Sequence, residues 1–187
     1  EKEKKATGIV TRTAARPYNK SSSIPSSRQY TTRKDARPLL AVNKAGVTGD
    51  YNHYRIMALN GTPDRAVSIL TSDAMKQVRA RFPKAQDGDL GENISVDGLM
   101  FGMLQPGRKL AIGKKVVVEI TEPIEPCANL CTLPYINNPD VDPKNKIQNC
   151  QNFLERLGRQ PGIRGWYAKV LGEGFVRVGD EVKAIAT

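Results

Sequence analysis

Short apolar and β-branched runs alternate along the chain with turns rich in glycine, proline, asparagine and aspartate. Such runs between turn residues are typical of β-strands. The pattern predicts strands at residues 6–13, 37–43, 63–72, 93–96, 105–112, 115–121, 162–171, 175–178 and 181–185. The Gly172-Glu-Gly174 segment predicts a hairpin that returns the chain into the 175–178 strand. A glycine turn followed by a strand occurs at Gly107 and again at Gly179, so we expect these strands at similar places in the sheet.

Two segments have the apolar spacing of an amphipathic helix. The first begins at Ser72, which we expect to be the N-cap, and ends at Pro83. Its apolar positions are Ala74, Met75, Val78 and Phe82. The second spans residues 146–157, with Gly158 expected just past its end. Its apolar face is formed by Ile147, Cys150, Phe153, Leu154 and Leu157, which we expect to lie in the core.

Many short strands with few helices predict a mainly β (α+β) fold. Helical patterns do not alternate with strands, which disfavours a parallel α/β sandwich. Closing the sheet on itself would remove its exposed edges. We therefore expect a closed or near-closed β-barrel with two or three peripheral helices. The 187 residues suit one domain, 1–187, with a tail at 1–5 and a barrel at 6–185 that carries a basic loop at about 13–36.

Positive charge is concentrated near the start of the sequence. The formal net charge is +10, and residues 1–38 hold ten Lys/Arg and three Asp/Glu, so +7 lies there and +3 in the rest. Such a basic arm attracts polyanions. Stacking aromatic residues are not interleaved with it, so nucleic acid is not the expected partner. No apolar run approaches the roughly 18–20 residues that a membrane span needs, so a membrane partner is not expected either.

The basic arm has two interpretations. Residues 4–34 contain no acid and are rich in Ser, Arg and Thr, as in an organellar transit peptide. The β-branched residues of 6–13 favour instead a first strand followed by a long loop, and we prefer this interpretation. The expected location is therefore the cytoplasm, with an organelle as the alternative.

Cysteine and histidine are scarce. Three cysteines are an odd count at low density, which argues against a disulfide scaffold and for a reducing compartment. His53 is the only histidine, so a histidine-rich metal site within this chain alone is excluded. Cys127 and Cys131 have the spacing of a metal or disulfide pair, but too few other soft ligands are available to favour a metal site.

Cys127 is the candidate reactive residue. The strand-forming run 116–120 leads into Pro123 and Pro126, and proline ends strand pairing because it lacks a backbone donor. A thiol at the end of a strand is well placed at the mouth of a pocket. The alternative is a small buried side chain, which is the ordinary role of a free cysteine. An acid beside the thiol would oppose the thiolate, so we expect at least one of Glu122 and Glu125 to face solvent.

Two arginines are candidate anion-binding residues. Arg55 follows a polar loop with Asp50 and His53, and Arg164 lies between two glycines at a strand start. Guanidinium groups donate paired hydrogen bonds to phosphate and carboxylate. The alternatives are a solvated loop for Arg55 and a surface turn for Arg164.

Five motifs occur in one order along the chain: Gly46-Val-Thr-Gly-Asp-Tyr-Asn-His53, Gly88-Asp-Leu-Gly-Glu-Asn-Ile94 with Gly98-Leu99, Pro126-Cys127, Gly162-Ile-Arg-Gly-Trp-Tyr-Ala-Lys-Val-Leu171 and Val178-Gly-Asp-Glu-Val182. Together they resemble a MOSC domain, the domain at the C-terminus of molybdenum cofactor sulfurases that also occurs as a stand-alone protein. The resemblance covers about residues 6–185.

The resemblance implies a closed β-barrel and a site at the family cysteine. Members are viewed as sulfur carriers that hold a persulfide on this cysteine, or as binders of the molybdenum cofactor (molybdopterin). In the amidoxime-reducing branch the cysteine ligates molybdenum. It thus implies Cys127 as the catalytic residue and metal ligand. It also implies Asn93, Arg164 and, by a looser match, Arg55 as cofactor-binding residues.

Three functional hypotheses follow. The first is a molybdenum-cofactor-binding protein that acts as an oxidoreductase on a small N-hydroxylated substrate, with Cys127 as metal ligand. The second is a sulfur carrier with a persulfide on Cys127 that Cys131 could resolve. The third is a barrel scaffold whose basic arm binds polyanion. The sequence matches neither the extra barrel domain nor the desulfurase domain of larger relatives. We therefore expect an electron-donor or sulfur-donor protein to act in trans.

Overall fold

A computed structural model describes residues 7–16, 32–51, 60–136 and 140–185. The strands are β1 (Thr7–Ala15), β2 (Asp35–Ala36), β3 (Leu40–Asn43), β4 (Gly46–Val47), β5 (Val67–Thr71), β6 (Ile94–Asp97), β7 (Lys109–Ile112), β8 (Val116–Pro123), β9 (Trp166–Gly172), β10 (Gly174–Val176) and β11 (Glu181–Ile185). The α-helices are α2 (Ser72–Arg81) and α3 (Pro143–Gly158). Short 3₁₀ helices are η1 (Pro63–Arg65), η2 (Phe101–Met103) and η3 (Ala128–Thr132).

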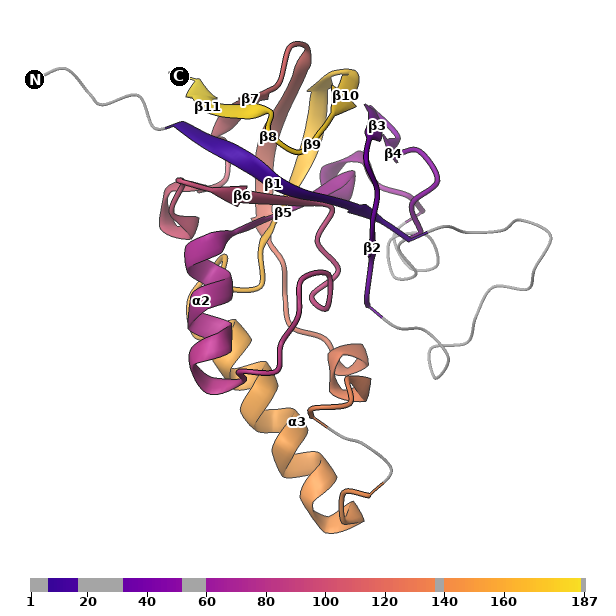
Figure 1. The fold of residues 1–187 in the computed structure, drawn as a ribbon, viewed down its shortest axis with the longest axis vertical. Coiled ribbons are helices and arrows are strands. Elements are labelled where there is room, and N and C mark those ends of the chain that lie inside the picture. The colour runs from indigo at the N-terminus through magenta and orange to yellow at the C-terminus, as the bar shows by residue number, and fades with distance from the viewer. Residues whose placement is uncertain (1–6, 17–31, 52–59, 137–139, 186–187) are drawn as a thin grey trace, which may run out of the picture.

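Seven strands form a closed barrel. Their order is β11-β7-β8-β9-β5-β6-β1, and β1 pairs again with β11, with Thr7 opposite Lys183. All of these pairs are antiparallel except β5 with β6, which is parallel. The two glycine-turn strands noted in the sequence, β7 and β11, lie side by side with Val182 opposite Ile112. The barrel occupies one end of the molecule (Figure 1). The predicted closed barrel is confirmed.

Alternating side chains fill the barrel. Along β8, Val116, Val118 and Ile120 are buried while their neighbours are partly exposed, and β9 alternates in the same way. Each fully buried aliphatic side chain stabilises the fold by about 1.5–3 kcal/mol. The period of two explains why the sequence pattern located these strands correctly.

A three-stranded sheet lies beside the barrel in the order β10-β3-β4. The predicted hairpin between the 162–171 and 175–178 strands is wrong in its pairing, because β10 pairs with β3 and places Val176 opposite Leu40. β8 pairs along β9 from Trp166 to Gly172, whereas β5 pairs only with Trp166–Ala168. The Glu173 side chain in the turn before β10 accepts from the Lys44 N–H at 3.1 Å, which holds this turn against the turn that follows β3.

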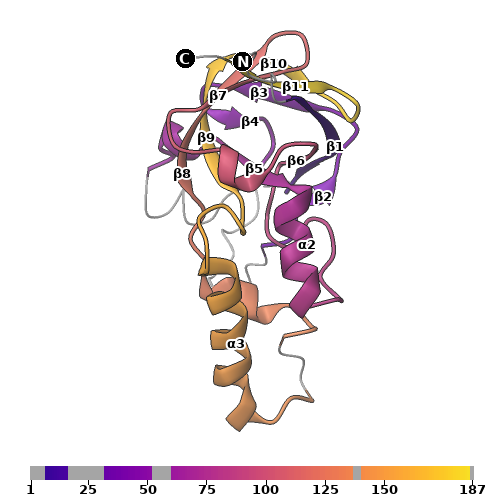
Figure 2. The same cartoon turned by 90° about the vertical axis from the view of Figure 1, so that its left-hand side faces the viewer.

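The helices form a second core outside the barrel. Ala74, Met75 and Val78 of α2 are buried with Phe153 and Leu157 of α3. The helix α3 extends away from the barrel (Figures 1 and 2). Among the described residues, no helix combines the length and apolarity that a membrane crossing requires.

Four details of the predicted helices are corrected. Thr71 is the N-cap of α2, one residue before the expected Ser72. Asp142 caps α3, which begins at Pro143 rather than at 146, and Gly158 is its last residue. Ile147 is 70% exposed, because the N-terminal part of α3 extends beyond the elements that could cover it.

Candidate functional site

A cavity of about 350 Å³ opens where β8 ends. Its lining comes from five parts of the chain that are far apart in sequence. These are the segment before β2, η1 with the start of β5, the loop between α2 and β6, the segment from the end of β8 into η3, and the residues before and at the start of β9. Volumes of roughly 300–1,000 Å³ are usual for sites that take small molecules.

Cys127 lies in this cavity with a free thiol. It follows the end of β8 at Pro123 and is the N-cap residue of η3, whose Leu130 N–H donates to the Cys127 carbonyl at 3.1 Å. A short 3₁₀ helix thus follows the cysteine directly. The residue is half-buried, so its sulfur is both sheltered and reachable. Glu125 is exposed, as expected.

Arg164 lines the same cavity and is 7% exposed. Its Nη1 donates to the main-chain carbonyl of Glu125, whereas its Nε is buried and has no hydrogen-bond partner among the described residues. Gly165, at φ 118°, permits this position, because a Cβ there would lie 2.8 Å from the carbonyl oxygen of Ile69. An unpartnered, buried guanidinium N–H is costly unless a ligand accepts from it. The arginine is thus at the cavity, and its contact with a ligand stays a prediction.

Lys34 is a lining residue that sequence reasoning missed. Its side chain is 4% exposed, and its ammonium lies 2.7 Å from Oδ2 of Asp50, whose side chain is 9% exposed. A buried ammonium requires such a partner. Lys34 lies in the acid-free segment 4–34, and the excess of positive charge in this segment is the only sequence feature that pointed to a role for it. Nothing in the pattern placed it near Cys127.

Asn93 lies next to the cavity, with its side chain held by protein groups. Its Oδ1 accepts from the Ser68 backbone N–H at 3.1 Å, and its Nδ2 donates to the carbonyl of Ala14 at 3.1 Å and to Asp50 at 3.0 Å. Asn93 thereby links Ser68, which lines the cavity, to the Asp50–Lys34 pair. A contact with cofactor, as the resemblance implies, stays a prediction.

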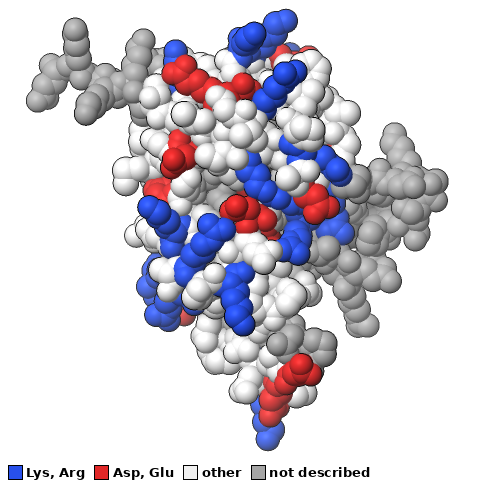
Figure 3. All heavy atoms as spheres, viewed as in Figure 1, with Lys and Arg blue, Asp and Glu red and all other residues white. Residues whose placement is uncertain are grey.

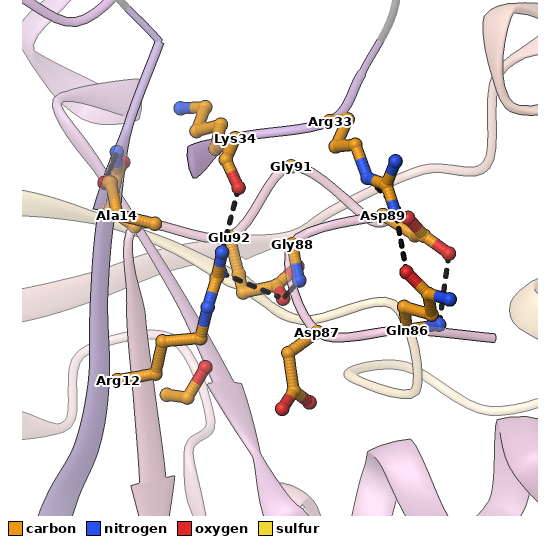
Figure 4. A network of polar contacts seen from close by, with 12 residues as sticks. Arg12, Ala14, Arg33, Lys34, Gln86, Asp87, Gly88, Asp89, Gly91 and Glu92 are labelled. Carbon is orange, nitrogen blue, oxygen red and sulfur yellow. Dashed lines mark hydrogen bonds and ion pairs between the residues drawn. The ribbon is translucent and has the colours of Figure 1, made fainter. Parts of the chain in front are cut away.

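The loop at residues 86–92 fixes the segment that carries Lys34. Lys34 N donates to the carbonyl of Gly88 at 3.0 Å, and Arg12 donates to the carbonyl of Lys34 at 2.8 Å. Figure 4 shows the Arg12 guanidinium between this carbonyl and Glu92. Glu92 is buried and 3.9 Å from Arg12. Burial raises the pKa of the Glu92 carboxyl, although the Gly88 N–H and Arg12 act against the rise.

Arg65 and Tyr167 form another part of the lining. The guanidinium carbon of Arg65 lies 4.9 Å from the centre of the Tyr167 ring, and its Nε lies 2.6 Å from Oε1 of Glu122. Cation–π contact and ion pairing together fix the arginine. Sequence analysis missed both residues: Arg65 lies in none of the five motifs, and Tyr167 lies in the motif of residues 162–171 but was not singled out there.

Two further expectations have different outcomes. Arg55, with His53, lies outside the described residues, so its role stays a prediction. Cys131 and Cys150 are joined in a disulfide, with Cα atoms 5.2 Å apart. The cysteine count argued against a disulfide scaffold, and it did not foresee this single disulfide. Packing of α3 against η3 brings the two together, which the cysteine count could not reveal. Cys131 is consequently not a free thiol that could resolve a persulfide.

Within the described ranges, no group of three or more His, Cys, Asp and Glu side chains could hold a metal ion. A metal at Cys127 would therefore need most of its ligands from elsewhere. A cofactor that brings its own sulfur ligands meets this requirement.

Comparison with known protein families shows to which family this chain belongs. The profile described as the MOSC domain matches residues 57–183. The chain belongs to the MOSC domain family. The matched range includes Asn93, Cys127 and Arg164 but neither Lys34 nor Asp50, so part of the cavity lies outside it.

Solved structures share the MOSC protein's fold at low sequence identity. The YUAD protein from Bacillus subtilis is 19% identical with a TM-score of 0.72, over 97% of each chain. YiiM from Geobacillus stearothermophilus is 17% identical with a TM-score of 0.58, over 97% of this chain and 75% of that one. YiiM from Escherichia coli is 20% identical with a TM-score of 0.54, over 84% and 67%. No curated protein sequence matches the chain.

Proposed function

We propose that this MOSC protein binds the molybdenum cofactor in the Cys127 cavity, with the Cys127 thiolate as a metal ligand, and reduces a small N-hydroxylated substrate. The observation that carries the proposal is the presence in one cavity of a free, half-buried thiol and a buried arginine with an unpartnered Nε. A thiolate is a suitable ligand for a soft metal, and a guanidinium N–H can donate to the anionic part of the cofactor.

The described residues fit such a cofactor in three respects. The cavity offers one soft ligand, and the pterin dithiolene supplies further sulfur. Arg164 lines the cavity and favours an anionic ligand, beside Lys34 and Arg65, whose charges Asp50 and Glu122 balance. Leu90 and Ile124 contribute apolar side chains to the lining, against which a flat ring system would pack.

Each residue has a distinct task in this proposal. Cys127 holds the metal, and the Arg164 Nε–H donates to an anionic oxygen of the cofactor. Lys34 supplies a further cationic group to the lining, and Asp50 and Asn93 keep its ammonium in place. The bound cofactor supplies the redox-active metal at which an N–O bond is reduced. Electrons then come from a donor protein, because no other redox centre is apparent in the described chain.

The alternative function is that of a sulfur carrier. The free thiol of Cys127 beside cations also supports this chemistry. The Cys127 thiolate would attack the terminal sulfur of a donor's persulfide. The S–S bond of the donor breaks, its thiolate leaves, and the sulfur atom with its proton stays on Cys127.

One experiment separates the two functions. The chain and its Cys127→Ser variant are expressed in a host that makes the cofactor and in a strain that cannot make it. Molybdenum is measured by mass spectrometry of the metal, and persulfide by the mass that one sulfur atom adds to the Cys127 peptide. The proposal requires near-stoichiometric molybdenum only in the unsubstituted chain from the producing host. Persulfide on Cys127 with molybdenum at the level of the variant would establish the carrier instead.

A further inference from the structure

A second cavity, of about 430 Å³, lies on the outside of the barrel wall against α2. It shares no lining residue with the Cys127 cavity. Four cations line it: Arg12, Arg37, Lys76 and Arg79. Asp87 is the sole acid among the described lining residues. Figure 3 shows Lys and Arg side chains gathered over α2 and towards β1 and β2 on this face. We call this cavity the basic groove.

A β-bulge in β1 forms one wall of the basic groove. The register between β1 and β6 shifts between Val10 and Arg12, so one extra residue lies on β1. For this reason Val10 and Ala15 both contribute to the barrel core although they are an odd number of residues apart. The shift turns Thr11 and Arg12 towards the groove, as bulges commonly re-aim side chains at sites.

The adjoining part of this wall is held by main-chain bonds. Arg37 N donates to the Thr13 carbonyl at 2.8 Å, and the Thr13 hydroxyl donates to the Arg37 carbonyl. The backbone that presents the Arg37 side chain is therefore fixed on both sides.

One face of α2 forms the opposite wall. Ser72, Met75, Lys76 and Arg79 follow the spacing of helix positions that share a face. Met75 is buried, whereas Val178, at the groove's rim, is 58% exposed. The groove thus joins cationic walls to an apolar edge.

Two of the four cations are already neutralised. Arg12 donates to the Lys34 carbonyl and faces Glu92, and Arg79 bonds to Asp87 at 3.0 Å. Among the described residues, the structure gives no side-chain partner to Arg37 or Lys76. Two like charges in one groove repel each other, and a bound dianion removes that cost. The Ser95 hydroxyl, also in the lining, can donate to the same anion.

We propose that the basic groove is a binding site for a small phosphomonoester. Arg37, Lys76 and Ser95 hold the phosphate, and the carbon part of the ligand packs on Met75 and Val178. The rigid walls favour a compact ligand over a flexible polyanion. This site is independent of the function proposed for Cys127, because the two cavities share no residue.

Phenyl phosphate is the probe, and binding is measured by isothermal titration calorimetry at physiological ionic strength, which screens diffuse surface attraction. Phenol, inorganic phosphate and a single-stranded oligonucleotide are titrated in parallel. The variants are Arg37→Gln and Lys76→Gln, and Arg177→Gln is a matched control at another basic surface. We expect phenyl phosphate to bind more tightly than phenol or inorganic phosphate. Each groove variant weakens it at least about tenfold, since each removes a charge-assisted bond.

Four outcomes would overturn the proposal. These are absent binding of phenyl phosphate, equal binding of phenol, binding by the oligonucleotide alone, and affinity that Arg37→Gln and Lys76→Gln leave at the level of Arg177→Gln. Circular dichroism of each variant shows whether it is folded. The Arg37 side chain is partly exposed and the Lys76 side chain is exposed, so we expect both variants to fold.

Discussion

The side-chain amide of Asn93 donates a hydrogen bond of 3.0 Å to Oδ2 of Asp50, the same oxygen that lies 2.7 Å from the Lys34 ammonium. One carboxylate oxygen thus joins the glycine-rich motif to a cation that lines the Cys127 cavity. In this arrangement Asn93 acts on the cavity through Asp50 and Lys34.

Asn93→Ala is expected to destabilise the fold and disturb the cavity. It leaves the Ser68 N–H and the Ala14 carbonyl without their side-chain partner, and each unsatisfied buried group costs about 1–3 kcal/mol. Urea denaturation measures the loss. Asn152→Ala, at an exposed position of α3, is the control and should change stability by less than about 0.5 kcal/mol. Equal effects of the two substitutions would show that the amide is not a structural link.

Arg164→Met tests the anion donor. The methionine retains much of the apolar stem but has no N–H group, so we expect cofactor affinity to fall at least about tenfold. The readout is retention of molybdenum during dialysis, with thiol labelling of Cys127 to show that the cavity is intact. Arg81→Met, at an exposed residue of α2, serves as control. If Arg164→Met retained molybdenum as well as the control does, Arg164 would not hold the cofactor.

Glu92 predicts a pH dependence of stability. Burial raises the pKa of the Glu92 carboxyl in the folded state above its ordinary value of 4.5. The folded state therefore binds the proton more tightly than the unfolded state does, and stability is lost as pH rises from 4.5 through the folded pKa. Glu92→Gln retains an oxygen that can accept from the Gly88 N–H but cannot ionise.

The measurement is urea denaturation of both proteins across this pH range. The difference in unfolding free energy between Glu92→Gln and the parent should increase with pH, by at most about 1.4 kcal/mol per pH unit. Parallel stability profiles would contradict the assignment to Glu92.

The Cys131–Cys150 disulfide predicts a redox dependence of stability. It closes a loop with a sequence separation of 19. Loss of such a bridge costs about 2–4 kcal/mol in unfolding free energy. Replacing both cysteines by serine should lower the urea midpoint, and dithiothreitol should lower that of the parent but not of the double variant. A parent midpoint that dithiothreitol leaves unchanged would show that the bridge does not stabilise the fold.

Much of the barrel was predictable from sequence, because alternation along strands such as β8 is a local property. The pairing of β10 with β3 was not, since it joins two segments that lie far apart in the sequence. The exposure of Ile147 was likewise not predictable from the sequence. Helical spacing identifies the face that can be buried, but not whether any element lies against it.

The candidate site was predictable only where a residue falls in a motif. Cys127 and Arg164 do, and they share a cavity. Lys34 does not, because its place depends on the partnership with Asp50 and on the loop that binds its backbone. The disulfide was missed because the proximity of Cys131 and Cys150 arises from tertiary packing alone.

The central claim is that Cys127 binds molybdenum. Its most direct test is the ratio of molybdenum to chain in protein purified from a cofactor-producing host, compared among the parent, Cys127→Ser and the Cys131→Ser/Cys150→Ser double variant. We predict a ratio near one for the parent and the folded double variant, and near zero for folded Cys127→Ser. Equal ratios in the parent and Cys127→Ser, or none in either, would contradict the claim.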